Sequence, residues 1–236
     1  MIELSEVQGF ICRDGTTDAN AVYARVNDEY RLWDRKWSGW AIDIGAMIGT
    51  VGLTLAQQNP DLRVLCVEAV PDNSDLLEAN ITRLGLAARV TSIRAWAAKP
   101  GTVSGVCHYG YRHRESESDG YVSAHRFVGN TWIHLGEPEH SVEVPAVSLD
   151  SLLGTYGIDD VALLKIDCEG CEWAFLDTPA ISKVVVIRGE YHGGYPGESG
   201  HVFEPMHAIQ RLLEATHDVE ILVEDPSVGM FTAVRR

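Results

Sequence analysis

The sequence predicts an α/β fold built on a doubly wound, mostly parallel sheet, and three observations support this. Short apolar runs alternate with helix-like segments between residues 40 and 98, a pattern typical of parallel sheets covered by helices. Several apolar runs end in an acid, as at Asp43, Glu68 and Asp167. The 236 residues, 45% of them hydrophobic, are enough for one sizeable core. We therefore expect one α/β domain over residues 40–236.

Residues 1–39 precede this domain and are expected to form an N-terminal helical cap segment. Between Asp18 and Trp37 the apolar residues recur at helical spacing, at Val22, Val26, Tyr30 and Trp33. Such a helix either packs on the sheet or covers the mouth of a ligand site. Its amphipathic face could also serve a homodimer.

A glycine turn follows the first core strand, Trp40–Ile44. Gly45 permits a sharp turn with no Cβ between the backbone and a ligand, and Ala46 stands beside it. The amides that open the next helix, which runs to Gln58, favour an anionic group. Asp43 would repel a phosphate but attract an ammonium group, which favours a cofactor with an amino-acid end, S-adenosylmethionine, over a dinucleotide. A tight connection without a ligand is the alternative interpretation of this turn.

Two further residues stand at the ends of neighbouring strands. Glu68 follows the second strand, Arg63–Val67, 25 positions after Asp43. A carboxylate at this place suits a ribose diol because it accepts both hydroxyl protons. Trp96 follows the third strand, Arg89–Ala95, and either stacks on an adenine or belongs to the core.

Turn and cap residues place the remaining elements. In chain order we predict a helix over Pro71–Leu84, a hairpin strand over Thr102–Tyr111, a strand over Val142–Val147, a helix over Ser148–Tyr156 with Ser148 as its cap, a strand over Lys183–Ile187, a helix over Phe203–Ala215, and a closing strand pair over Asp218–Val223 and Met230–Val234 around the turn at Asp225-Pro226. Residues 107–140 interrupt this order with a polar, histidine-bearing insertion, which is either a lid over the site or a surface excursion.

Acids gather after the later strands. Asp167 ends a buried strand, and Glu169 and Glu172 follow within six residues. Such clustering is costly for a purely structural element, although a helix N-terminus would account for Glu169 or Glu172. Glu190 and His192 alternate at the next strand end and so share one side of it. Ligands bind at the carboxyl ends of strands in open α/β sheets, so these residues are candidates for a site.

The five cysteines are expected to be thiols, because their number is odd and no secretory signal precedes them. Cys168 and Cys171 have the spacing of a redox or zinc motif. No second cysteine or histidine pair completes a zinc site, so we assign them no function.

The composition restricts the partners. The formal net charge is −15 and the sequence pI is about 4.9, which disfavours nucleic acids and anionic membranes. No apolar run reaches membrane-spanning length, and the N-terminus lacks a signal-peptide pattern. We expect a cytoplasmic protein that acts on a small molecule.

Together these motifs resemble the FkbM-type family of class I S-adenosylmethionine-dependent methyltransferases. The resemblance is carried by Asp43–Gly49, Glu68–Pro71 with Asn80, Ala95–Ala97 with Gly101, Leu149-Asp150, Leu164–Glu172 and Glu190–His192. Of these, Leu164–Glu172 is the most specific match. The sequence departs from the family pattern at Met47, where asparagine is usual, and at Ala69, where a second proline is frequent.

The resemblance implies a Rossmann-like, seven-stranded sheet with an antiparallel last strand. It also implies methyl transfer from S-adenosylmethionine, for which a hydroxyl of a sugar or natural product is the default acceptor. The cofactor-binding residues would be Asp43, Gly45, Ala46, Glu68, Ala69, Trp96 and Asp167. N-methyl transfer, a non-catalytic cofactor-binding module and a dinucleotide-dependent oxidoreductase are the alternatives.

For the catalytic base, His192 is the first candidate because the unperturbed pKa of histidine lies near neutrality. Asp167 and Glu169 come next, as bases or positioning groups. No metal site is assigned from the sequence. Asp167, Glu190 and His192, together with Glu169, are nevertheless candidate ligands for a hard divalent cation that would acidify a hydroxyl.

Overall fold

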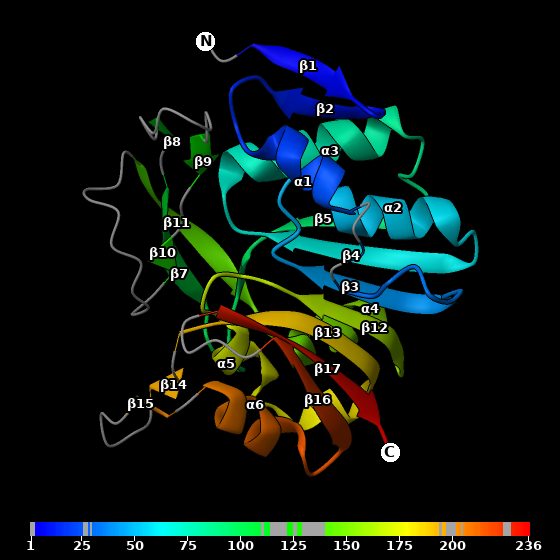
Figure 1. The fold of residues 1–236 in the computed structure, drawn as a ribbon, viewed down its shortest axis with the longest axis vertical. Helices are drawn as coiled ribbons and strands as arrows, with labels where there is room; N and C mark the ends of the chain where they lie inside the picture. The colour runs from blue at the N-terminus through cyan, green and yellow to red at the C-terminus, as the bar shows by residue number, and fades with distance from the viewer. Residues whose placement is uncertain are drawn as a thin grey trace.

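The computed structural model is built around a seven-stranded sheet (Figure 1). It describes residues 3–25, 28, 30–109, 111–113, 122–124, 127–128, 140–193, 195–196, 202–203, 205–223 and 228–236. In spatial order the strands are β16 (His217–Val223), β17 (Val228–Arg235), β13 (Val184–His192), β12 (Val161–Ile166), β3 (Gly39–Ile44), β4 (Leu62–Glu68) and β5 (Val90–Arg94). The strands from β5 to β13 run parallel, and β17 is antiparallel to both neighbours. The expected mostly parallel sheet with an antiparallel last strand is confirmed.

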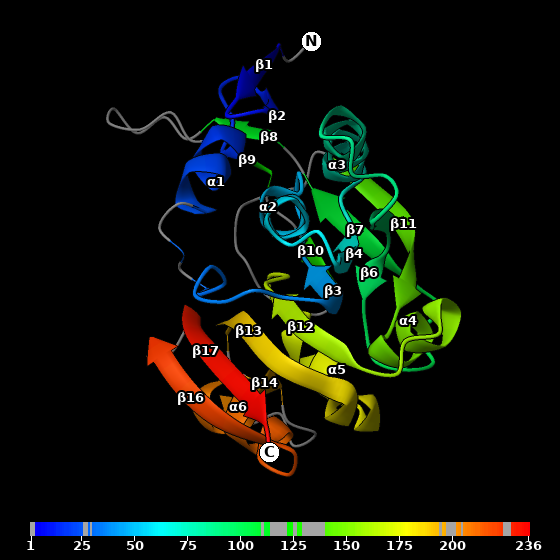
Figure 2. The same ribbon diagram turned by 90° about the vertical axis from the view of Figure 1, so that its right-hand side faces the viewer.

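Helices cover both faces of the sheet (Figures 1 and 2). One face carries α1 (Asp18–Ala24), α2 (Thr50–Gln58) and α3 (Pro71–Arg83), and the other carries α4 (Leu149–Tyr156), α5 (Glu172–Leu176), the 3₁₀ helix η2 (Pro179–Lys183) and α6 (Pro205–Leu213). Ser148 caps α4 as predicted, because its side chain accepts a hydrogen bond from the Ser151 amide. Among the described helices, none combines the length and apolar composition that a membrane crossing requires.

Alternate residues of the central strands face the two helical layers. Ile42 and Ile44 pack in the core beneath α4, α5 and α6. Ala41 packs in the other core, beneath α2 and α3. Asp43 alternates with Ile42 and Ile44, so a carboxylate is buried on the face that α2 covers.

A second sheet, of four strands, stands beside the first. It has the order β10 (Phe127–Val128), β7 (Ser104–Tyr109), β11 (His140–Val147) and β6 (Trp96–Ala97). The sequence predicted the strands β7 and β11 but not their pairing into a separate sheet. Gly105 makes the close packing of β7 possible, since a Cβ there would overlap the ring of Trp96.

Two short hairpins complete the described strands: β8 (Tyr111–His113) with β9 (Val122–Ala124), and β14 (Tyr195–Pro196) with β15 (Val202–Phe203). Most of the predicted insertion at 107–140, and the turn at Asp225-Pro226, lie outside the described residues. Whether the insertion is a lid therefore stays a prediction.

The N-terminal segment differs from the predicted long helix. It begins with a hairpin, β1 (Leu4–Val7) and β2 (Phe10–Arg13), and α1 ends at Ala24. The Asp28 carboxylate accepts hydrogen bonds from the Leu32 and Trp33 amides, and Asp28 has a positive φ of 49°. This local turn replaces helical hydrogen bonds, so Tyr30 is buried and Trp33 is half-buried from a non-helical segment.

Candidate functional site

The candidate site lies where neighbouring parallel strands end. The glycine turn follows β3, Glu68 is the last residue of β4, and Asp167 directly follows β12. Glu190 and His192 are among the last three residues of β13. Parallel pairing brings these ends to one edge of the sheet. These predicted residues therefore lie at one edge of the sheet, and their roles in a site stay predictions.

The turn after β3 is held against its neighbours. Gly45 has a φ of 73°, and a Cβ at this position would overlap the carbonyl oxygen of Asp167. The Gly45 and Ala46 amides both donate to the Val67 carbonyl, at 3.0 Å each. These amides are thus engaged within the protein, and Gly45 and Ala46 line the adjoining cavity.

Asp43 forms a buried ion pair with Lys165, a residue that the sequence reasoning missed. The two side chains are 1% and 4% exposed, with Lys165 Nζ 3.2 Å from Asp43 Oδ1. Lys165 also donates to the Gly45 carbonyl at 3.1 Å, and Asp43 accepts from the Gly52 amide at 2.9 Å. Burial raises the pKa of Asp43, and the charge of Lys165 opposes this rise. Asp43 lines neither of the two cavities described below, so its contact with an ammonium group stays a prediction.

Glu68 is likewise buried, at 1% exposure. Its carboxylate accepts hydrogen bonds from the Met47 and Val70 amides, at 2.8 and 2.9 Å, and from the Asn73 side chain at 3.4 Å. Glu68 therefore links the glycine turn to the start of α3. A ribose diol would have to replace the Met47 amide or share the carboxylate with it.

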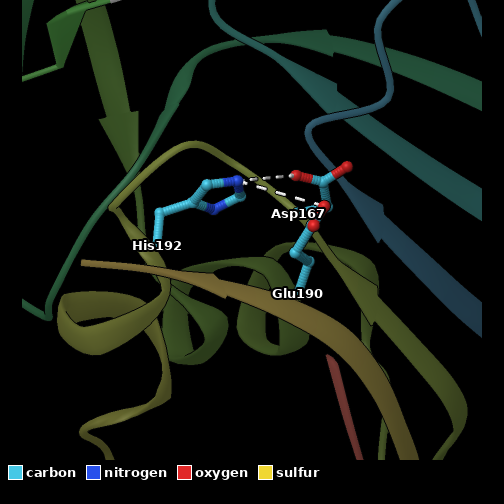
Figure 3. Close-up of side chains that lie close together, drawn as sticks. All are labelled: Asp167, Glu190 and His192. Carbon is cyan, nitrogen blue, oxygen red and sulfur yellow. Dashed lines mark ion pairs between the residues drawn. The ribbon is translucent and has the colours of Figure 1, made fainter. Parts of the chain in front are cut away.

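His192 is surrounded by carboxylates. Its Nε2 atom lies 3.5 Å from Glu169, 3.9 Å from Asp167 and 4.0 Å from Glu190. Figure 3 shows the Asp167 and Glu190 side chains directed toward the imidazole from the neighbouring strand ends. The ligand atoms of Asp167, Glu190 and His192 all lie within 4.8 Å of one another. The sequence-predicted catalytic residues thus form one cluster.

Glu172, at the start of α5, fixes the other side of the imidazole. Its fully buried carboxylate lies 3.0 Å from His192 Nδ1 and also accepts from the Cys168 and Gly170 amides. From the sequence, a helix N-terminus offered a structural explanation for Glu172. Apart from the cluster of acids, no feature of the sequence indicated that Glu172 contacts His192. Because the Nδ1 side is bonded, the Nε2 side faces the site.

The pKa of His192 differs from the unperturbed value on which its choice as a base was argued from the sequence. Burial by itself would lower its pKa, but the hydrogen bond and charge of Glu172, with the charges of Glu169 and Asp167, outweigh burial and raise the pKa to about 9. At neutral pH the side chain therefore carries a proton. A base role requires this proton to leave first.

The larger described cavity, of about 100 Å³, lies between the glycine turn and the N-terminal segment. Gly45, Ala46 and Met47 line one side, and Tyr30 and Trp33 line the other. The Tyr30 hydroxyl donates to Asp167 Oδ2 at 2.8 Å. Residues of the N-terminal segment thus form part of the wall of this cavity. That the segment covers the mouth of a ligand site stays a prediction.

A smaller cavity, of about 20 Å³, is also lined by Gly45. It is lined by Ile44, Gly45, Val67, Ala69, Ala95, Trp96, Ala97, Cys168 and Cys171. Trp96 and Ala69 therefore line the same cavity. The Trp96 Nε1 atom is buried and has no hydrogen-bond partner among the described residues.

Cys168 and Cys171 form a disulfide, so the expectation that all cysteines are thiols is wrong for this pair. The three other cysteines, Cys12, Cys66 and Cys107, are free and buried. The sequence argument depended on the odd count and the expected compartment. Neither the odd count nor the compartment gives the geometry of the loop after β12, which brings the Cα atoms of Cys168 and Cys171 to 5.5 Å, within the range of a disulfide.

Comparisons with known proteins give one family and a set of similar folds. The family model described as "Methyltransferase FkbM domain" matches residues 43–220. No curated protein sequence matches the chain. The chain is similar to EvdMO1, with a TM-score of 0.50 and 16% identity over 100% of this chain and 44% of that one.

Two other solved structures are similar at lower TM-scores. The precorrin-6y C5,15-methyltransferase from Geobacter metallireducens has a TM-score of 0.48 and 13% identity, over 99% of this chain and 94% of that one. The O-methyltransferase from Bacillus cereus, solved with SAH, has a TM-score of 0.44 and 16% identity, over 84% and 74%.

Proposed function

The chain belongs to the family of methyltransferase FkbM domains, and on this premise we propose that it transfers a methyl group from S-adenosylmethionine to a hydroxyl of a small molecule. The observation that carries the proposal is the cluster of Asp167, Glu169, Glu190 and His192 beside the glycine turn. This cluster supports the proposal because it offers a candidate for removing the acceptor's proton beside the predicted cofactor turn.

S-adenosylmethionine would supply a methyl group on a sulfonium that carries its own leaving group. The protein therefore needs to align the acceptor and remove its proton, rather than form a covalent intermediate. Gly45 and Ala46 line the larger cavity, and Ala69 and Trp96 line the smaller one. We propose that the methionine end binds in the first cavity and the nucleobase in the second, with Glu68 at the ribose between them.

We propose that Asp43 acts on the cofactor through the turn. Its ion pair with Lys165, together with the bond from Lys165 to the Gly45 carbonyl, holds the turn in its left-handed conformation. Asp167 is better placed than Asp43 for a direct contact, since it lines the larger cavity.

We propose His192 as the base, with Asp167 and Glu169 as positioning groups. Glu172 orients the imidazole through Nδ1, so the deprotonated Nε2 can accept the acceptor's proton. His192 first has to lose the proton that it carries at neutral pH. When the neutral imidazole then takes the acceptor's proton, the surrounding carboxylates stabilise the imidazolium that forms and so assist the transfer.

A turnover assay with labelled S-adenosylmethionine and candidate sugars and natural products tests the function. Calorimetry with S-adenosylhomocysteine and with NAD tests the cofactor, and we expect binding of the first only. Binding of NAD alone would favour an oxidoreductase, and cofactor binding with no methyl transfer to any extract component would favour a non-catalytic module. Transfer to an amine rather than a hydroxyl would support the N-methyltransferase alternative.

We propose a small uncharged or cationic acceptor in the cytoplasm, and no nucleic acid. The net charge of −15 and the four carboxylates around His192 would repel a polyanion. A homodimer through the N-terminal segment stays a proposal, which sedimentation analysis tests.

A divalent cation at this cluster is a second candidate feature. Asp167, Glu190 and His192 offer two carboxylates and an imidazole within 4.8 Å, and the bond from Glu172 to Nδ1 is the kind of contact that orients metal-bound histidines. Such an ion would be held by these residues and would acidify a hydroxyl. Calorimetry with Mn²⁺ on chelator-treated protein tests this, with Glu190→Gln as the variant expected to weaken binding. No heat of binding for the wild-type chain would contradict it.

A further inference from the structure

The disulfide at Cys168–Cys171 lies beside the site and has no part in the proposed reaction. It joins the two ends of a tight loop directly after β12, in which Glu169 and Gly170 have left-handed φ values of 59° and 107°. Both cysteines are buried, at 6% and 5% exposure. Glu169, within the loop, lies 3.5 Å from His192.

The same two cysteines form one wall of the smaller cavity. That cavity, of about 20 Å³, holds about one water molecule, which is far less than a purine ring occupies. If a nucleobase binds there, as proposed above, one wall has to move outward.

The other walls are fixed by the two sheets. The Gly45 amide donates to the Val67 carbonyl, and the Ala95 amide donates to the Glu68 carbonyl. The Trp96 ring packs directly against Gly105 of β7. Backbone in a hydrogen-bonded sheet moves less readily than a connecting loop. The wall that lies outside the two sheets is the loop of Cys168 and Cys171, which is held by the hydrogen bonds of its Cys168 and Gly170 amides to Glu172 and by the disulfide, its one covalent restraint.

We propose that the thiol–disulfide state of Cys168–Cys171 controls the entry of the cofactor's nucleobase. With the disulfide intact the cavity stays narrow, and with the bond reduced the loop moves outward and the cavity accepts the base. This rests on the proposed function, since it takes the smaller cavity as the nucleobase site.

The chemistry requires only a dithiol or two thiols. One thiolate attacks a sulfur of the disulfide, a mixed disulfide forms, and a second thiol resolves it. Two electrons and two protons pass to the protein, Cys168 and Cys171 become thiols, and the reductant becomes a disulfide. In a reducing compartment such as the proposed cytoplasm, disulfides are characteristically transient or redox-sensing.

The experiment measures S-adenosylhomocysteine binding by calorimetry on the full chain in two states, oxidised and reduced with dithiothreitol. Alkylation and mass spectrometry establish the state of each cysteine. We expect the reduced protein to bind at least about tenfold more tightly. The double variant Cys168→Ser/Cys171→Ser should bind like the reduced protein and not respond to dithiothreitol. The control variant Cys12→Ser, in β2 and outside the cavity, should keep the full response.

Three results would overturn the inference. Equal or tighter binding by the oxidised protein would refute it while leaving the proposed function standing. A disulfide that stays intact in the folded protein under dithiothreitol would also refute it. Absence of S-adenosylhomocysteine binding in both states and in the double variant, with the fold intact by circular dichroism, would refute the proposed cofactor and this inference together.

Discussion

At the scale of single residues, the site depends on charges buried close to one loop. Lys165 is nearly excluded from water and contacts both Asp43 and the Gly45 carbonyl. A buried charge without its partner is costly, whereas the intact pair is roughly neutral for stability. Lys165 therefore makes the burial of Asp43 tolerable and ties β12 to the glycine turn.

Lys165→Met should destabilise the protein by about 3–5 kcal/mol, because it leaves the Asp43 carboxylate buried without its counter-charge. Adding Asp43→Asn should recover part of the loss, since the second change removes the orphaned charge. Urea unfolding measures both. Lys183→Met, at an exposed lysine, is the control and should stay within about 0.5 kcal/mol of wild type. No recovery in the double variant would contradict this account.

Met47→Asn should stabilise the protein by about 0.5–1 kcal/mol. Met47 has a φ of 52°, a left-handed conformation that asparagine adopts more readily than other non-glycine residues. Met47→Ala keeps the unfavourable backbone and should give no such gain. The midpoint of urea unfolding measures the effect, and a lower midpoint for Met47→Asn would show that the methionine side chain matters more than the backbone.

The raised pKa of His192 predicts the pH dependence of methyl transfer. If neutral His192 is the base, kcat/KM in chelator-containing buffer should rise tenfold per pH unit and level off near pH 9. Glu172→Gln should move the midpoint down toward 6.5, because it removes the charge that most favours the imidazolium. A wild-type profile that is flat from pH 6 to 9 would transfer the base role to a carboxylate.

At the scale of elements, the smaller cavity depends on how the second sheet meets the first. β7 passes against the Trp96 ring at Gly105, and Trp96 in turn lines the cavity beside the ends of β3 and β4. The position of the ring is thus decided by a strand that lies outside the central sheet. The loop after β12 forms the facing wall.

Gly105→Ala should weaken S-adenosylhomocysteine binding about tenfold or more, because the added Cβ overlaps the Trp96 ring and displaces it. Gly154→Ala is the matched control. Gly154 lies in α4 with open space around an added Cβ, so this change should leave binding unaltered and raise stability by about 0.5–1 kcal/mol. Calorimetry and urea unfolding give the two readouts, and unchanged binding by Gly105→Ala would remove Trp96 from the cofactor site.

At the scale of the whole molecule, the excess of acidic residues governs the response to salt. Thirty-four acids stand against 19 lysines and arginines, for a net charge of −15. Self-repulsion of this kind destabilises a compact chain, and dissolved ions screen it. Raising NaCl from about 10 mM to about 200 mM should therefore raise Tm at pH 7.5. The same addition near pH 5, close to the sequence pI of about 4.9, should have a smaller effect. Equal shifts at both pH values would mean that net charge is not the cause.

The sequence by itself determined the α/β fold, the ends of α3 and α4, and the edge of the sheet at which the candidate site residues lie. Those features depend on local signals, namely apolar runs, caps and glycines, and on the rule that parallel strands end at one edge. Only the tertiary structure decided which partners each polar residue contacts. The ion pair of Asp43 with Lys165 and the bond of Glu172 to His192 join residues far apart in the chain, and the N-terminal turn at Asp28 overrides a helical pattern. Burial and the distances to neighbouring carboxylates set the raised pKa of His192, which no local spacing encodes. The spacing of Cys168 and Cys171 is that of a redox motif, but only the folded loop after β12 shows that the two are joined.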